Sequence, residues 1–183
     1  MDTTTYIIVA VVLALVVVGG LLALVFTRRN RSAQFHDHFG SEYDRTVEAL
    51  GNEKKAQAEL NERQKHVDTL DIRPLSISER DRYLADWTAV QSKFVDEPGQ
   101  AIVDADHLIM EVMQLRDYPV SNFEERAADI SVNYPDLVSN YRAAQEIALK
   151  NKQHQANTEE LRQAVICYRS LFAELLETEA VAA

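Results

Sequence analysis

The first strong pattern along the chain is an apolar run from Tyr6 to Phe26, YIIVAVVLALVVVGGLLALVF, which contains no charged side chain. At about 1.5 Å per residue a helix of these 21 residues would be about 31 Å long and match a hydrocarbon core of about 30 Å. A cleaved signal peptide is the alternative, but it has a basic n-region and a shorter apolar core, whereas the preceding MDTTT has no basic residue. The pattern predicts a tail at residues 1–5 and a transmembrane helix at 6–27.

After a basic juxtamembrane segment and hinge at residues 28–40, apolar positions recur every three or four residues, the spacing of amphipathic helices. Gly and Pro are scarce, with 5 and 4 copies, which favours helix interiors over turns and strands. The chain therefore predicts an all-α fold in which the transmembrane helix is followed by a helical bundle of about five to seven helices. This soluble domain is expected at residues 41–177, with a frayed C-terminus at 178–183.

Polar capping residues and prolines predict where the helices begin. Ser76, Ser121 and Asn157 are each followed at the third position by Glu, the spacing of a capping box. Pro98 and Pro135 suit the first turns of two other helices.

The beginning of the domain leaves one alternative open. Apolar residues at helical spacing from Phe35 to Leu50 predict one amphipathic helix, which Gly51 stops or kinks. The stretch at 52–70 has few apolar residues among many charged and amide side chains, so it fits either a solvated stalk or one arm of a hairpin with a narrow buried stripe. We favour the arm.

The candidate core consists of the large apolar residues that share a face on the predicted helices. The last helix, from about Thr158, has the widest apolar face and is expected at the centre of the bundle. The core candidates are Tyr83, Trp87, Phe94, Leu108, Val112, Tyr141, Leu161, Tyr168, Phe172 and Leu175.

The formal charge of −10 is distributed unevenly, because Arg28, Arg29 and Arg31 directly follow the apolar run. From Ser32 onward there are 16 basic and 28 acidic residues, a net charge of 16 − 28 = −12. Since basic flanks stay on the cytoplasmic side, the arginines predict a single-pass protein of the cell (inner) membrane, with the N-terminus outside and the domain in the cytoplasm. A domain outside the cell is the alternative. The acidic domain disfavours nucleic-acid binding.

Sequence patterns for catalysis are missing: there is no G-x-x-x-x-G-K, no G-x-G-x-x-G and no G-x-S-x-G. The tripeptide HDH at 36–38 combines metal-ligand types, but helical residues two apart point about 200° away from each other. Asp104 and His107 share a face, but the Glu-x-x-His pairs of di-metal bundles are absent. Cys167, the single cysteine, lies in an apolar run and is expected to pack as a small hydrophobe. We therefore expect no catalytic residues, no metal and no cofactor.

Several segments together resemble an uncharacterised family of bacterial proteins with one N-terminal span. They are FGSEYDRTVEALG, LDIRPLSISERDRYLADWTAVQSKFVDEP, a helix ending in RDYPV, ADISVNYPDLVSNYRAA and TEELRQAVICYRSLFAELLE, which cover nearly all of the domain. The resemblance implies a single-span membrane protein with a helical domain. It implies no activity, because the family has no established function; its members are described as hypothetical, membrane or secreted proteins. The description "secreted" conflicts with the orientation that the arginines predict, and we follow the arginines.

A tether joined to a domain without catalytic motifs favours a scaffold or adaptor rather than an enzyme. Such a protein would hold a protein partner at the membrane through a helix face or groove, and the acidic surface favours a basic partner. Two alternatives are a homo-oligomeric envelope component, assembled through the span and residues 43–70, and a ligand-binding or enzymatic bundle. The latter would require polar groups that converge in a pocket.

Overall fold

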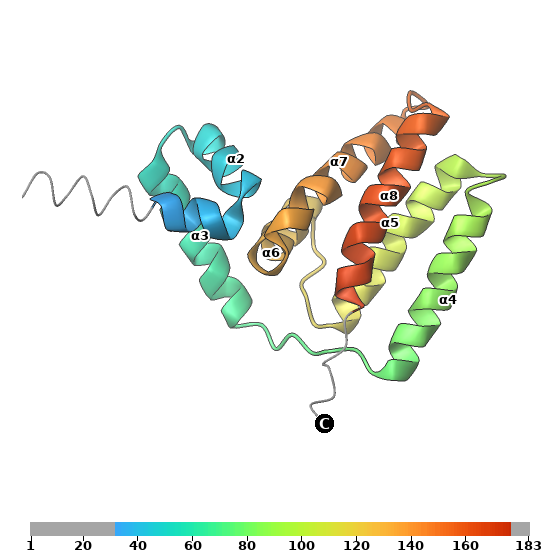
Figure 1. The fold of residues 1–183 in the computed structure, drawn as a ribbon, viewed down its shortest axis with the longest axis horizontal. Helices are drawn as coiled ribbons and strands as arrows, with labels where there is room; N and C mark the ends of the chain where they lie inside the picture. Colours follow the sequence, from blue (N-terminus) through green and yellow to red (C-terminus); the bar gives the residue numbers. More distant parts are fainter. Residues whose placement is uncertain (1–31, 177–183) are drawn as a thin grey trace, which may run out of the picture. The chain divides into compact units, whose positions relative to one another are not determined.

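The computed structural model describes residues 32–176. Residues up to His38 and residues from Phe39 onward form two compact units, and the described part of the first unit is helical. Over its described residues the second unit contains helices and no strand, which confirms the prediction of an all-helical bundle. Its helices, labelled in Figure 1, are α2 (Ser41–Leu50), α3 (Glu53–Asp68), α4 (Ile77–Lys93), α5 (Pro98–Leu115), α6 (Phe123–Asn133), α7 (Pro135–Lys152) and α8 (Thr158–Leu175).

The predicted transmembrane helix at 6–27 lies outside the described residues, as do Arg28, Arg29, Arg31 and the segment at 178–183. Within residues 32–176, none of the helices combines the length and the apolar character that crossing a bilayer requires.

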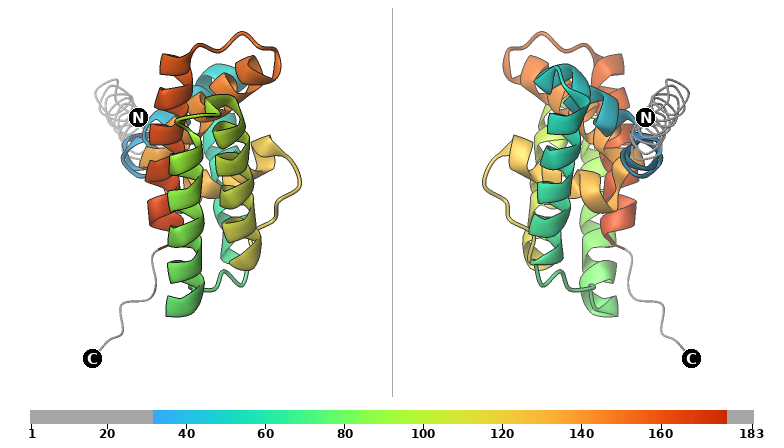
Figure 2. Two further views of the ribbon diagram at one scale, coloured as in Figure 1. Left: turned by 90° about the vertical axis from the view of Figure 1, so that its right-hand side faces the viewer. Right: turned by 90° about the vertical axis from the view of Figure 1, so that its left-hand side faces the viewer.

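Helix α8 packs against both α5 and α7, as expected for the helix with the widest apolar face (Figure 1). Helix α4 packs along α5, and Figure 2 shows these two helices side by side. Trp87 of α4 also stacks on Phe172 of α8, with ring centroids 4.7 Å apart. The apolar core therefore lies among α4, α5, α7 and α8, and α6 adds Ala127 and Ile130 to it.

The structure buries almost all of the core candidates. Only Phe94 is partly exposed, because it is the C-cap residue of α4 and lies where the helix ends, although it still packs against the core. The buried candidates are Tyr83, Trp87, Leu108, Val112, Tyr141, Leu161, Tyr168, Phe172 and Leu175.

Capping side chains begin four of these helices, and at α3 the cap is Asn52, which accepts from the N–H of Lys55. Ser76 accepts a hydrogen bond from the backbone N–H of Glu79 and completes a capping box at α4, and Asn157 does the same at α8. The predicted cap at Ser121 is wrong by one residue. Asn122 caps α6 by accepting from the N–H of Glu125, because its side-chain carbonyl reaches that free backbone donor, while the Ser121 hydroxyl donates to the Glu125 carboxylate instead.

The amphipathic helix predicted from Phe35 to Leu50 is interrupted. Gly40 has φ 50, in the left-handed region that favours glycine, and separates the helical residues 32–39 from α2. The buried face of α2 also differs from the prediction, because Glu42 is buried whereas Leu50 is 42% exposed.

Helix α3 is an arm of a hairpin with α2 and packs against α6, so the stretch at 52–70 is not a solvated stalk. Its narrow buried stripe consists of Ala56, Leu60 and Val67. The remainder of the helix is strongly polar, which explains why periodicity alone could not decide between a solvated stalk and a hairpin arm.

Arg116 fixes the connection between α3 and α4 to the bundle. Its backbone carbonyl accepts from the N–H of Arg73 at 3.3 Å, and its Nε donates to the carbonyl of Arg73 at 3.2 Å. Its Nη1 donates to the carbonyl of Leu175 at 3.1 Å. The connection is therefore tied to the ends of both α5 and α8.

Candidate functional site

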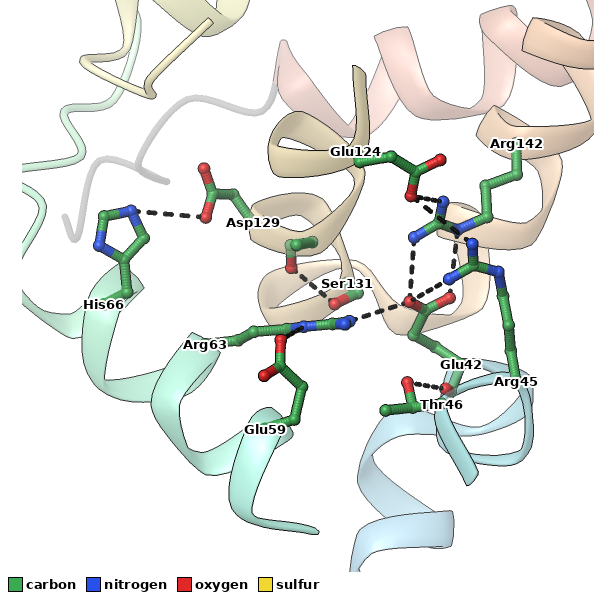
Figure 3. A network of polar contacts seen from close by, with 11 residues as sticks. Glu42, Arg45, Thr46, Glu59, Arg63, His66, Glu124, Asp129, Ser131 and Arg142 are labelled. Atoms are coloured by element: carbon green, nitrogen blue, oxygen red, sulfur yellow. Dashed lines mark hydrogen bonds and ion pairs between the residues drawn. The ribbon is translucent and has the colours of Figure 1, made fainter. Parts of the chain in front are cut away.

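Glu42 of α2 carries a carboxylate although its side chain is only 1% exposed. Its Oε1 accepts from Nη1 of Arg63 on α3 at 3.0 Å and from Nη2 of Arg142 on α7 at 3.0 Å, while Nε of Arg142 reaches Oε2 at 3.3 Å. Arg45, one turn further along α2, lies 3.5 Å from Oε1 (Figure 3). A buried charge is tolerated only where it is paired and hydrogen-bonded. Glu42 therefore ties α2 to α3 and α7.

Arg142 extends this network to α6, because its third nitrogen, Nη1, donates to Glu124 at 2.7 Å. Burial favours a lower pKa for Arg142, but its hydrogen bonds to Glu124 and Glu42 outweigh burial and raise the pKa. The same hydrogen bond lowers the pKa of Glu124, so both groups are charged at neutral pH. We call Glu42, Arg45, Arg63, Glu124 and Arg142 the Glu42 cluster.

A pocket of about 430 Å³ lies beside the cluster and is lined by residues of α3 and α6. Helix α3 contributes Glu59, Glu62, Arg63 and His66, helix α6 contributes Glu125, Ala128 and Asp129, and Pro119 precedes α6. Four carboxylates thus accompany one guanidinium and one imidazole. We call it the α3–α6 pocket; its excess of negative charge suits a cation rather than an anion.

Asp129 is the buried carboxylate of the α3–α6 pocket, with a side chain that is 5% exposed. Among the residues that the structure describes, none donates a hydrogen bond to it; Nε2 of His66 is 3.7 Å from Oδ1, an ion pair only when the imidazole is protonated (Figure 3). Burial raises the pKa of Asp129, although the positive charges of His66 and Arg63 act in the opposite direction. The carboxylate is therefore short of donors.

A second polar cluster lies inside the bundle and joins α5, α6, α7 and α8. Nε of Arg126, which is 6% exposed, donates to the hydroxyl of Tyr141 at 3.1 Å. Asp106 Oδ1, Gln145 Oε1 and Tyr168 Oη are buried without a hydrogen bond of ordinary geometry among residues 32–176, although the Tyr168 hydroxyl is close enough to Asp106 to act on its pKa. Burial raises the pKa of Asp106 and raises that of Tyr141 to about 12.

The residues that combine metal-ligand types in the sequence do not converge. His36 and His38 are exposed on the helical residues 32–39. Asp104 accepts from Lys93 at 2.7 Å and from Gln100 at 2.9 Å, so both of its carboxylate oxygens are already engaged. Within the described range 32–176, no three His, Cys, Asp or Glu side chains are grouped so that they could hold a metal ion.

Sequence reasoning missed Glu42, Arg142 and Asp129. One signal was available for Glu42, because it lies three residues after Phe39 and four before Thr46, on the face that α2 buries. A glutamate at such a position is ordinarily read as solvated, since its partners are distant in the sequence.

No protein-family model, no curated protein and no solved structure matches this chain. The resemblance to a bacterial family of single-span proteins therefore stays a prediction.

Proposed function

We propose that the protein is a membrane-tethered helical adaptor whose domain binds a protein partner on the cytoplasmic side of the cell membrane. The observation that carries the proposal is the Glu42 cluster. It fixes α2, the helix of the domain nearest in sequence to the predicted span, to α3, α6 and α7. An adaptor needs such a fixed first helix, because a partner is held in place only if the tethered end of the domain does not detach.

The charge of the domain supports a basic partner. From Ser32 onward 28 acidic residues stand against 16 basic ones, and the α3–α6 pocket has the same sign. Complementary charge increases the rate of association and selects the partner.

In vivo crosslinking of the tagged full-length chain tests the proposal. The matched control is a chain of residues 1–31 with the same tag, which keeps the predicted tether and lacks the domain. Reproducible capture of another protein by the full chain but not by the control is expected. Capture of nothing beyond the control would refute the adaptor, and capture of the chain itself alone would favour the homo-oligomeric alternative.

The predicted orientation is tested with Ser32→Cys in intact cells and an impermeant thiol reagent. The wild-type chain is the control, because its only thiol, Cys167, is 5% exposed. Labelling above the wild-type background is expected only after the membrane is permeabilised. Strong labelling of intact cells would place the domain outside.

A further inference from the structure

We propose that the α3–α6 pocket receives a lysine or arginine side chain of the partner and that Asp129 is the carboxylate that binds it. The inference rests on the proposed function and specifies the chemistry by which the partner is recognised.

Asp129 is buried in the α3–α6 pocket without a hydrogen-bond donor among the described residues. Its carboxylate lines the pocket, and its side chain is only 5% exposed. Burying a carboxylate without donors is costly, and an ammonium or guanidinium group supplies the missing donors together with a compensating charge. Figure 3 shows His66 of α3 and Asp129 of α6 facing each other, with the imidazole as the only cation-forming group drawn beside this carboxylate.

The lining of the α3–α6 pocket is predominantly acidic. Glu59, Glu62 and Glu125 add three carboxylates to that of Asp129. The one guanidinium, of Arg63, is already engaged by Glu42 at 3.0 Å and by Glu59 at 3.2 Å. Glu59 is thus paired with Arg63, and Glu62 is paired with Lys65 at 2.7 Å. An incoming cation therefore meets Asp129 and Glu125, which have no Lys or Arg ion pair among residues 32–176.

The α3–α6 pocket also has an apolar part and a volume suited to a side chain. Pro119 and Ala128 line it together with the acids, and apolar contacts of this kind suit the aliphatic stem of lysine or arginine. Its volume of about 430 Å³ falls at the lower end of ligand pockets, which range over about 300–1,000 Å³. An organic cation fits better than a metal ion, because no metal-type group of three ligands is present among residues 32–176.

The test uses the full-length protein in an uncharged detergent and a fluorescent arginine-rich peptide as the probe, with fluorescence anisotropy at about 0.15 M ionic strength so that diffuse attraction is screened. Asp129→Asn removes the negative charge and one of the two acceptor oxygens while nearly keeping the shape of the side chain. The matched control is Asp86→Asn, which makes the same change on the exposed part of α4. Asp129→Asn is expected to weaken the binding of the peptide about tenfold, and Asp86→Asn is expected to leave it unchanged.

A second variant, Ala128→Leu, fills the pocket without changing any charge and keeps the test valid if Asp129→Asn does not fold. It is expected to weaken the binding of the peptide to a similar extent. Equal binding by Asp129→Asn, Ala128→Leu and Asp86→Asn would overturn the inference.

Two further outcomes separate this inference from the adaptor proposal. If crosslinking captures the same partner with Asp129→Asn as with the wild-type chain, the adaptor stands and the pocket is not its recognition site. If arginine amide binds the wild-type protein in ligand-observed NMR while the peptide does not, the pocket binds a small free cation and does not receive a side chain of a partner protein.

Discussion

Replacing Glu42 by Gln isolates the contribution of the buried charge to the docking of the α2–α3 hairpin. The substitution keeps the length of the side chain and removes the negative charge that faces Arg63 and Arg142, whose side chains are 17% and 12% exposed. Both guanidinium groups would stay largely buried with one fewer carboxylate. The expected effect is therefore the penalty of leaving buried cations insufficiently paired.

The magnitude follows from what each arginine retains. Breaking a buried ion pair costs about 3–5 kcal/mol, but Arg142 keeps Glu124 at 2.7 Å and Arg63 keeps Glu59 at 3.2 Å. These remaining carboxylates are 67% and 50% exposed, so water screens them and they compensate only in part. We expect the docked hairpin to lose about 3 kcal/mol, which corresponds to a roughly hundredfold change in its opening equilibrium.

Hydrogen-exchange mass spectrometry of the full-length protein in detergent measures this opening helix by helix. In Glu42→Gln, amides of α2 and α3 should exchange roughly a hundredfold faster, while those of α5 and α8 keep their wild-type rates. Glu59→Gln is the matched control, because it removes a half-exposed partner of the same Arg63 and should cost less than about 1 kcal/mol.

Exchange of α2 and α3 that is no faster in Glu42→Gln than in Glu59→Gln would refute the penalty assigned to the buried charge. Equal acceleration of α5 and α8 would refute a different step, namely that the hairpin opens separately from the apolar core.

Three other changes test the remainder of the fold, each by urea unfolding of the full-length protein. Trp87→Ala removes the ring stacked on Phe172 and should lower the free energy of unfolding by about 3–5 kcal/mol. Hydrogen bonds from Arg73 and from Ser76 at the helix cap lower the pKa of Glu79 from 4.5 to about 2. The ionised Glu79 therefore stabilises the fold above its unfolded pKa, and this stabilisation is lost as the pH falls through the folded pKa. Glu79→Gln should have a lower free energy of unfolding than the wild type at pH 7, and the difference should vanish as the pH falls towards 2. The pKa of Asp106 is raised instead, so its effect on stability runs the other way. The protonated side chain is compatible with burial below the unfolded pKa, and the free energy of unfolding falls as the pH rises through the folded pKa. Asp106→Asn should therefore be more stable than the wild type by about 1 kcal/mol at pH 7 and equal to it in acid; a constant difference across the pH range would contradict this assignment.

The bundle helices could be predicted because their signals are local. Ser76 and Asn157 each lie three residues from the Glu that completes a capping box, and Pro98 and Pro135 occupy first turns where a missing N–H costs nothing. The apolar period then indicates which face is buried, and Trp87 and Phe172 lie on such faces.

The Glu42 cluster could not be predicted, because its pairing is not local. Arg63 lies 21 residues from Glu42, and Arg142 lies 100 residues from it. Periodicity identifies a buried face only by its apolar residues, so a charged residue on that face is assigned to solvent. Asp129 was missed for the same reason, since its burial depends on α3 packing over α6.

The two polar sites have different charge balances, and this links the hairpin to the binding of a partner. The Glu42 cluster combines three arginines with two glutamates, so both of its carboxylates are paired and it holds the hairpin without a ligand. The α3–α6 pocket keeps its excess of carboxylates and is lined by α3 and α6, two of the helices that the cluster joins. A cation bound there contacts both helices and therefore binds only the docked hairpin. At a peptide concentration of 100 times Kd, linkage adds about 2.7 kcal/mol to the docked state and should slow hydrogen exchange in α3 about a hundredfold. Unchanged exchange in α3 at saturation would place the peptide elsewhere on the domain.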